Sequence, residues 1–119
     1  MFAIRKELIE PKIVVLHLSG RIAVGRPCQE IEETIQGLIE ENRFWVILDL
    51  AEVQRVDSTG FGTIVLCGGK LKKAGGELRV AAANDMVEEI AVSSQIRRIV
   101  MFDKTVAEAV AALKVVATE

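Results

Sequence analysis

The chain has 119 residues, a length that predicts a single domain spanning residues 1–119. Hydrophobic residues make up 50% and charged residues 27%, which is typical of a globular protein that buries a core. The net charge of −2, the lack of a basic run and an uncharged stretch of only residues 58–69 argue against nucleic acid and a membrane as partners. Because the N-terminus also carries charges where a signal peptide has its apolar core, we expect a cytoplasmic protein.

The N-terminal part of the chain predicts a pair of strands followed by a helix. Residues 2–9 alternate loosely between apolar and polar side chains, as in a half-buried edge strand, and residues 12–18 form a β-branched strand after a turn at Pro11. The short turn predicts antiparallel pairing. Residues 20–27 are predicted to form a loop, and residues 28–42 an amphipathic helix with one apolar stripe.

The middle of the chain predicts a buried strand and a second helix. Residues 44–50 are nearly all apolar, as expected for a strand covered on both faces, and a helix is expected over residues 58–74. Gly68 and Gly69 lower the helix propensity of that segment, which close packing against the sheet would explain. Residues 77–83 predict the next strand.

The C-terminal part predicts two further helices around a short strand. Asp85 has capping-box spacing before a helix over residues 85–94, and residues 98–102 predict a strand. The "TVAE" sequence from Thr105 predicts a better capping box before the last helix. The resulting order, β-β-α-β-α-β-α-β-α, predicts an α/β domain whose sheet of about five strands is mostly parallel, with right-handed crossovers and an antiparallel N-terminal edge strand.

The cysteines and the histidine do not predict a metal site. Cys67 lies in an apolar helical pattern and is expected in the core, whereas Cys28 follows a proline and is expected to be partly exposed. His17 has no acidic or cysteine neighbour along its predicted strand, which favours a structural role.

Motifs of common enzyme classes are absent from the sequence. The "GGK" of residues 68–70 lacks the upstream glycine and the following hydroxyl of a phosphate-binding loop, and "GFG" at residues 60–62 lacks the third glycine of a dinucleotide fingerprint. There is no GxSxG nucleophile elbow. The residues therefore predict neither an enzyme nor a bound cofactor.

The segment "VDSTG", residues 56–60, has two interpretations. In the first, Asp57 or Ser58 caps the following helix by accepting a hydrogen bond from a backbone N–H, and Gly60 permits a close approach. In the second, a hydroxyl in the exposed first turn is phosphorylated, which leaves the fold intact but changes the surface by about −1.5 to −2 charges. An interface closing over such a turn would then be lost without unfolding.

Residues 45–83 resemble the core of the STAS domains, the anti-sigma factor antagonists. The resemblance rests on an apolar strand that ends in Asp-Leu, the sequence hydrophobic-Asp-Ser-Thr-Gly-Phe-Gly, a helix and then Gly-Gly. These features stand at Asp49–Leu50, Val56–Gly62 and Gly75–Gly76. Because the whole order of elements also fits, the resemblance covers nearly the full chain and implies a sheet with about four helices mainly on one face.

The resemblance implies a binding module in a partner-switching circuit. The partner would be a serine kinase that is also an anti-sigma factor, and a serine phosphatase would reset the module. Ser58 matches the phosphorylated serine, ATP belongs to the kinase, and Asp57, Thr59 and Gly60 shape the partner-binding site. Arg21 in the 21–26 loop, with Asn84 and Met86 in the 84–86 turn, would lie at the same end of the sheet.

The sequence departs from the family in the loop "GRIAV", residues 20–24. Arg21 stands where the family often has an acidic residue, and Ala23 replaces an aspartate. Arg21 and Arg26 are therefore candidates to pair with a phosphate on Ser58. Two alternatives remain open at this point: an unphosphorylated scaffold or assembly subunit of the same fold, and a nucleotide-binding domain.

Overall fold

The computed structural model describes residues 1–117. Their elements follow the predicted order: β1 (Ala3–Glu10), β2 (Ile13–Ile22), α1 (Arg26–Glu40), β3 (Trp45–Val56), α2 (Ser58–Lys73), β4 (Glu77–Ala81), α3 (Asp85–Ser93), a short 3-10 helix (Ile96–Arg98), β5 (Met101–Asp103) and α4 (Val106–Ala117).

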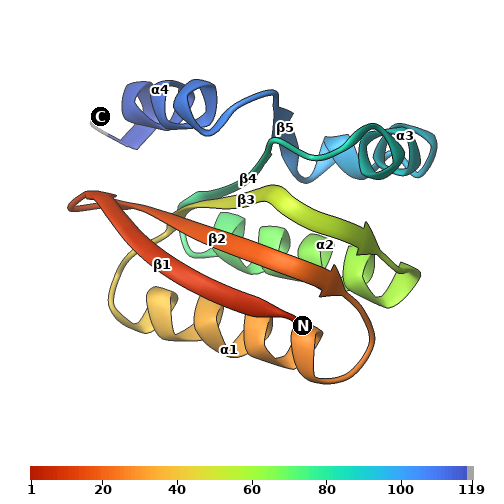
Figure 1. The fold of residues 1–119 in the computed structure, drawn as a ribbon. Helices are drawn as coiled ribbons and strands as arrows, with labels where there is room; N and C mark the ends of the chain where they lie inside the picture. Colours follow the sequence, from red (N-terminus) through yellow and green to blue (C-terminus); the bar gives the residue numbers. More distant parts are fainter. Residues whose placement is uncertain (118–119) are drawn as a thin grey trace.

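The strands form one sheet in the order β1-β2-β3-β4-β5 (Figure 1). β1 pairs antiparallel with β2, and the remaining neighbours pair parallel. This confirms the predicted α/β class with an antiparallel edge strand. Since spatial order equals chain order from β2 to β5, right-handed crossovers carry the connecting helices to the same side of the sheet.

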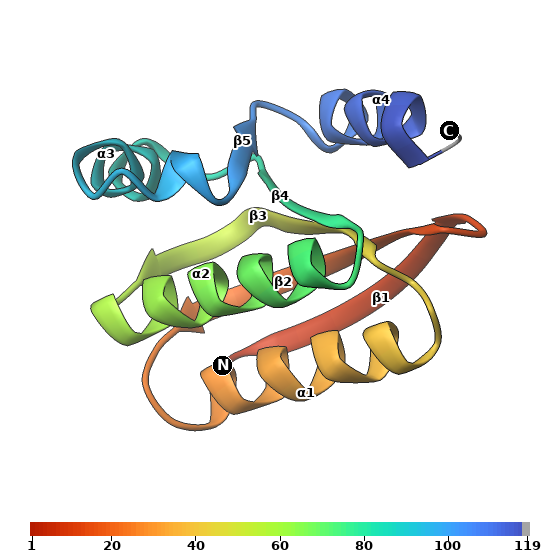
Figure 2. The ribbon, with the colours of Figure 1, turned by 180° about the vertical axis from the view of Figure 1, so that it is seen from behind.

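One face of the sheet packs against α1 and α2, which lie side by side beneath it (Figure 2). Alternate residues of β2 and β3 point into this core, where they meet the buried stripe of α1 and the apolar side of α2. Val87 and Ala91 of α3 join the same core. Three of the four helices therefore contribute to one core, as the resemblance implied.

The other face of the sheet is covered only in part, by α4. Ala109 and Leu113 of this helix pack on Ile13, Val15 and Ile47 near the start of the strands. Thr105 caps the helix as predicted, because its Oγ1 accepts a hydrogen bond from the Glu108 backbone N–H at 3.1 Å. Farther along β2 and β3 the same face is polar, and this part of the sheet leads to the candidate site.

Two strands are longer than the sequence predicted. β2 continues to Ile22 and β3 to Val56, so the predicted loop over residues 20–27 shrinks to three residues and α1 begins at Arg26. The pairing of β2 with β3 contains two irregularities, between His17 and Ser19 and between Gly20 and Arg21. Each places an additional β3 residue in the ladder, as a β-bulge does.

The local predictions about two cysteines and two glycines are each correct for one residue of the pair and wrong for the other. Cys67 is fully buried as predicted, but the prediction for Cys28 is wrong: it is 5% exposed, and its Sγ donates to the Ala23 carbonyl at 3.2 Å. A Cβ on Gly68 would meet the Val100 side chain at 2.8 Å, whereas one on Gly69 would meet nothing within 4 Å. Close packing therefore explains Gly68 alone, and its partner is the segment before β5.

The boundaries near the C-terminus also differ from the prediction. The N-cap of α3 is Asn84 instead of Asp85, since Asn84 Oδ1 accepts from the Val87 N–H at 2.9 Å. The predicted strand over residues 98–102 is the 3-10 helix followed by a strand of only three residues, Met101–Asp103.

Candidate functional site

The turn between β3 and α2 is built on the side chain of Asp57. Its Oδ1 accepts a hydrogen bond from the Gly60 N–H at 2.7 Å, which makes Asp57 the N-cap of α2. Ser58 is the first residue of the helix and is exposed. In residues 1–117 its hydroxyl has no hydrogen-bond partner. Capping therefore leaves Ser58 chemically free.

The same carboxylate also holds the loop between β2 and α1. Asp57 Oδ2 accepts from the Val24 N–H at 3.0 Å, and the Asp57 N–H donates to the Ile22 carbonyl at 3.1 Å. The hydrogen bonds from Gly60 and Val24 hold the pKa of Asp57 below its usual value. The group is therefore ionised at neutral pH and joins two connections at the carboxyl ends of β2 and β3.

Gly60 brings α2 close to the end of β2. A Cβ at this position would lie 2.4 Å from the Ile22 carbonyl oxygen and 2.9 Å from Val56 Cγ1. Such distances leave no room for a side chain, so glycine is required here. The first turn of α2 thereby sits against the last residue of β2, as the interpretation of "VDSTG" as a close approach predicted.

Arg21 lies beside this turn together with Arg55, which the sequence interpretation missed. The two arginines are direct partners in the parallel ladder of β2 and β3. Both are exposed, and with Asp57 they line a surface hollow of about 220 Å³. The missed signal is the spacing of Leu50, Val53 and Val56, whose buried side chains continue β3 through residues that read as a connection.

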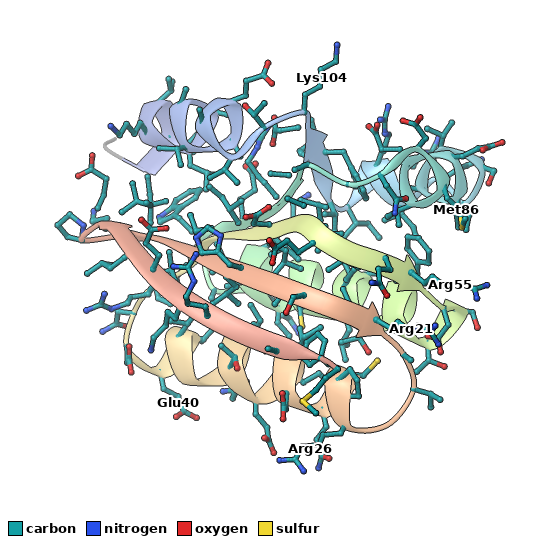
Figure 3. All side chains as sticks on the ribbon, viewed as in Figure 1. Arg21, Arg26, Glu40, Arg55, Met86 and Lys104 are labelled. Atoms are coloured by element: carbon teal, nitrogen blue, oxygen red, sulfur yellow. The ribbon has the colours of Figure 1, made fainter. Side chains whose placement is uncertain are left out.

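Asn84 ties the start of α3 to the end of β3. Its Nδ2 donates to the carbonyls of Gln54 at 3.2 Å and Val53 at 3.4 Å, while its Oδ1 caps α3. Met86 follows on α3 and is 55% exposed. Figure 3 shows Met86, Arg55 and Arg21 at the same end of the molecule.

Arg26 does not join this group. It lies on α1, where its Nε donates to Glu30 Oε1 at 2.9 Å, and Figure 3 shows it on the far side of the loop from Arg21. The structure thus brings Arg21, Asp57 and the segment around Asn84 to one end of the sheet, with Ser58 and Thr59 exposed in the same turn.

A second polar group, also missed, lies on the uncovered face of the sheet. His17 Nδ1 is 2.6 Å from Asp49 Oδ2, and His17 Nε2 is 2.6 Å from Glu7 Oε1. Partial burial lowers the pKa of His17, but the hydrogen bonds to Glu7 and Asp49 outweigh it, so the pKa is raised. With both nitrogens engaged, the imidazole links three strands and offers no free base.

The described part of the chain offers neither a metal-binding cluster nor a membrane-spanning helix. Residues 1–117 contain no cluster of three or more histidine, cysteine, aspartate or glutamate side chains that could hold a metal ion. None of the helices in those residues combines the length and the apolar character needed to cross a bilayer.

Comparison with known proteins gives one family and a set of similar folds. The model of the STAS domain matches residues 6–109. The anti-sigma factor antagonist SpoIIAA in its unphosphorylated form is 20% identical, with a TM-score of 0.80, over 94% of this chain and 96% of that chain. An anti-sigma factor antagonist from Mycobacterium paratuberculosis is 18% identical, with a TM-score of 0.83, over 96% and 95%.

A third structure is that of the Bacillus cell fate determinant SpoIIAA in the phosphorylated form. It is 20% identical, with a TM-score of 0.73, over 92% of this chain and 98% of that chain. No curated protein sequence matches the chain. At these identities the structural likeness establishes the fold.

Proposed function

Because the chain belongs to the STAS domain family, we propose that it is a partner-switching module of the anti-sigma factor antagonist kind, and not an enzyme. In this proposal it binds, in the cytoplasm, a serine kinase that also acts as an anti-sigma factor. Phosphorylation of Ser58 releases that partner, and a serine phosphatase restores binding. The similarity to an antagonist known in unphosphorylated and phosphorylated forms supports the proposal.

The observation that carries the proposal is the separation of roles between Asp57 and Ser58. Asp57 supplies the cap and holds the Val24 loop, whereas the exposed Ser58 hydroxyl makes no hydrogen bond in residues 1–117. A phosphate on Ser58 therefore removes no contact on which the fold depends. The kinase would transfer the γ-phosphoryl group of its ATP to Ser58 Oγ, releasing ADP and the hydroxyl proton.

The phosphate changes the surface more than the fold. It brings about −1.5 to −2 charges to the N-terminus of α2, where the helix dipole favours negative charge and Asp57 opposes it. A partner that fits the uncharged Ser58 would have to remove this added charge from water, which costs more than an exposed interface contact returns. Release without unfolding follows from this difference.

Incubation with ATP and the cognate kinase, followed by phosphosite mapping, tests the proposal. We expect one phosphate on Ser58 that is lost in Ser58→Ala, with Thr59→Ala as the matched control in the same turn. Ser58→Ala should bind the kinase like the parent chain, and Ser58→Glu should bind at least about tenfold more weakly. Equal binding by the parent, Ser58→Ala and Ser58→Glu would refute the switch.

One alternative is an unphosphorylated scaffold of the same fold. It is supported by the departure from the family pattern at Arg21 and Ala23, where the family often has acidic residues. In that case the kinase, or another partner, would bind the chain without modifying it. Phosphosite mapping of protein purified from its own cells decides between the two functions, because a phosphate on Ser58 excludes a pure scaffold. No observation of the described residues supports the nucleotide-binding alternative. Titration with ATP and GTP would test it.

A further inference from the structure

Two arginines stand directly opposite each other at the edge of the candidate site. Arg21 of β2 and Arg55 of β3 are partners in the parallel ladder, and neighbouring strands lie about 4.8 Å apart. Like charges in this arrangement destabilise a sheet. Neither arginine forms an ion pair within residues 1–117, although other arginines there have carboxylate partners; these are Arg26, Arg43, Arg79 and Arg97.

The carboxylate in the lining of the hollow does not neutralise the pair. Asp57 lines the same hollow, but its two oxygens accept hydrogen bonds from the backbone N–H groups of Gly60 and Val24. It forms no ion pair with either arginine in the described chain. Both guanidinium groups are exposed and free to turn toward an anion that enters the hollow.

Ser58 is exposed and directly follows Asp57, which lines the hollow together with the two arginines. We propose that Arg21 and Arg55 together hold the phosphate carried by Ser58. This inference rests on the proposed function, because it needs Ser58 to be the modified residue. A phosphate dianion is the ligand that two guanidinium forks fit best, through paired N–H donors.

The charges explain why the arrangement is useful. Arg21, Arg55 and Asp57 carry a net charge of about +1, and the phosphate changes this to between about −0.5 and −1. Binding the phosphate relieves the repulsion between the arginines and offsets the repulsion from Asp57. It also occupies two cationic side chains of the surface, so phosphorylation adds a negative group and withdraws two positive ones in the same step.

The test uses a chain with phosphoserine installed at position 58 during translation, so that no kinase is required. The second pKa of the phosphate, normally about 6, is followed by ³¹P NMR titration. Nearby arginines favour the dianion and lower this pKa. We expect Arg21→Gln and Arg55→Gln each to raise it by about 0.2 to 0.7, and the double variant to raise it further.

Arg26→Gln is the matched control, since Arg26 is an equally charged residue that pairs with Glu30 on α1. It should leave the phosphate pKa unchanged. The proposal is overturned if Arg21→Gln and Arg55→Gln leave that pKa unchanged, or if Arg26→Gln raises it as much as they do. In the second case the phosphate senses only the net charge of the domain.

Two further measurements separate this inference from neighbouring ones. If the cognate kinase leaves Ser58 unmodified, the proposed function fails while the titration of the installed phosphoserine still decides the role of the arginines. Inorganic phosphate added to the unmodified chain tests a free anion as the ligand. Arginine Nε–H signals that move with inorganic phosphate, but not on phosphorylation of Ser58, would overturn the assignment to Ser58.

Discussion

Replacing Gly60 by alanine should disturb the candidate site, whereas the same replacement at Gly62 should strengthen the helix. Both glycines lie in α2, two residues apart. A Cβ on Gly60 would be 2.4 Å from the Ile22 carbonyl oxygen and 3.0 Å from Ile22 Cγ2, while one on Gly62 would meet nothing within 4 Å. The pair therefore separates steric packing from helix propensity within one segment.

The structure gives the magnitude of each effect. The obstructing atom at Gly60 is a backbone oxygen that also accepts from the Asp57 N–H, so it cannot move without weakening that bond. Overpacking of this kind costs about 1–3 kcal/mol. At Gly62 the only term is propensity, and alanine should stabilise the fold by about 0.5–1 kcal/mol.

Urea denaturation of both variants measures these free energies of unfolding directly. We expect the midpoint of Gly60→Ala to lie below that of the parent chain and the midpoint of Gly62→Ala above it, with unchanged slopes. Gly60→Ala should also weaken kinase binding, because the Ile22 end of β2 is displaced. Equal stability of Gly60→Ala and Gly62→Ala would show that the turn is looser than the structure indicates and would refute the reasoning.

Three further predictions concern single side chains. Because the folded state raises the pKa of His17, its ion pairs stabilise the fold fully below pH 6.5, and this contribution is lost as the pH rises through the folded pKa. Urea midpoints should therefore fall as the pH rises above 6.5, and a fall of the same size in His17→Gln would contradict this. Asn84→Ala should lower the free energy of unfolding by about 1–2 kcal/mol, measured by thermal unfolding. Asn84→Asp keeps the cap but loses the donor to β3, so it should recover only part of this loss. An unchanged midpoint in Asn84→Ala would contradict the role of Asn84 in joining α3 to β3. Burial raises the pKa of Cys67 to about 12, so in a Cys28→Ser chain an alkylating reagent should label Cys67 only in denaturant, and rapid labelling of the native chain would contradict its burial.

The order of elements was predictable because each element carries its own periodic signal. The apolar stripe of α1, the continuous apolar run at the start of β3 and the Thr105 capping box all depend on residues close together in the chain. The motif at residues 56–62 was equally local. Such features follow from propensity and pattern without knowledge of the tertiary structure.

The end of β3 could not be predicted in this way. Its buried residues Leu50, Val53 and Val56 recur every third position, because bulges add residues to the ladder with β2. A strand is recognised by a period of two, so residues 51–55 resembled a connection. This error hid Arg55 and with it half of the arginine pair.

Contacts between residues far apart in the chain could not be predicted from the sequence either. His17 has no acidic neighbour along β2, and its partners Glu7 and Asp49 come from the strands on either side. Asn84, and not Asp85, is the N-cap of α3, and its amide also donates to carbonyls of β3. Register and tertiary hydrogen bonds decide both cases, and neither leaves a periodic trace in the sequence.

The two interpretations of "VDSTG" are complementary in the structure. A hydroxyl that caps its own helix is already engaged, and modifying it would remove a bond that the fold needs. Here the carboxylate of Asp57 makes the cap and anchors the Val24 loop, which leaves Ser58 exposed at the end of the same helix. Gly60 keeps this turn against the end of β2, the strand that carries Arg21. A rigid turn with an unengaged hydroxyl is the arrangement in which a phosphate changes recognition and leaves folding unaffected.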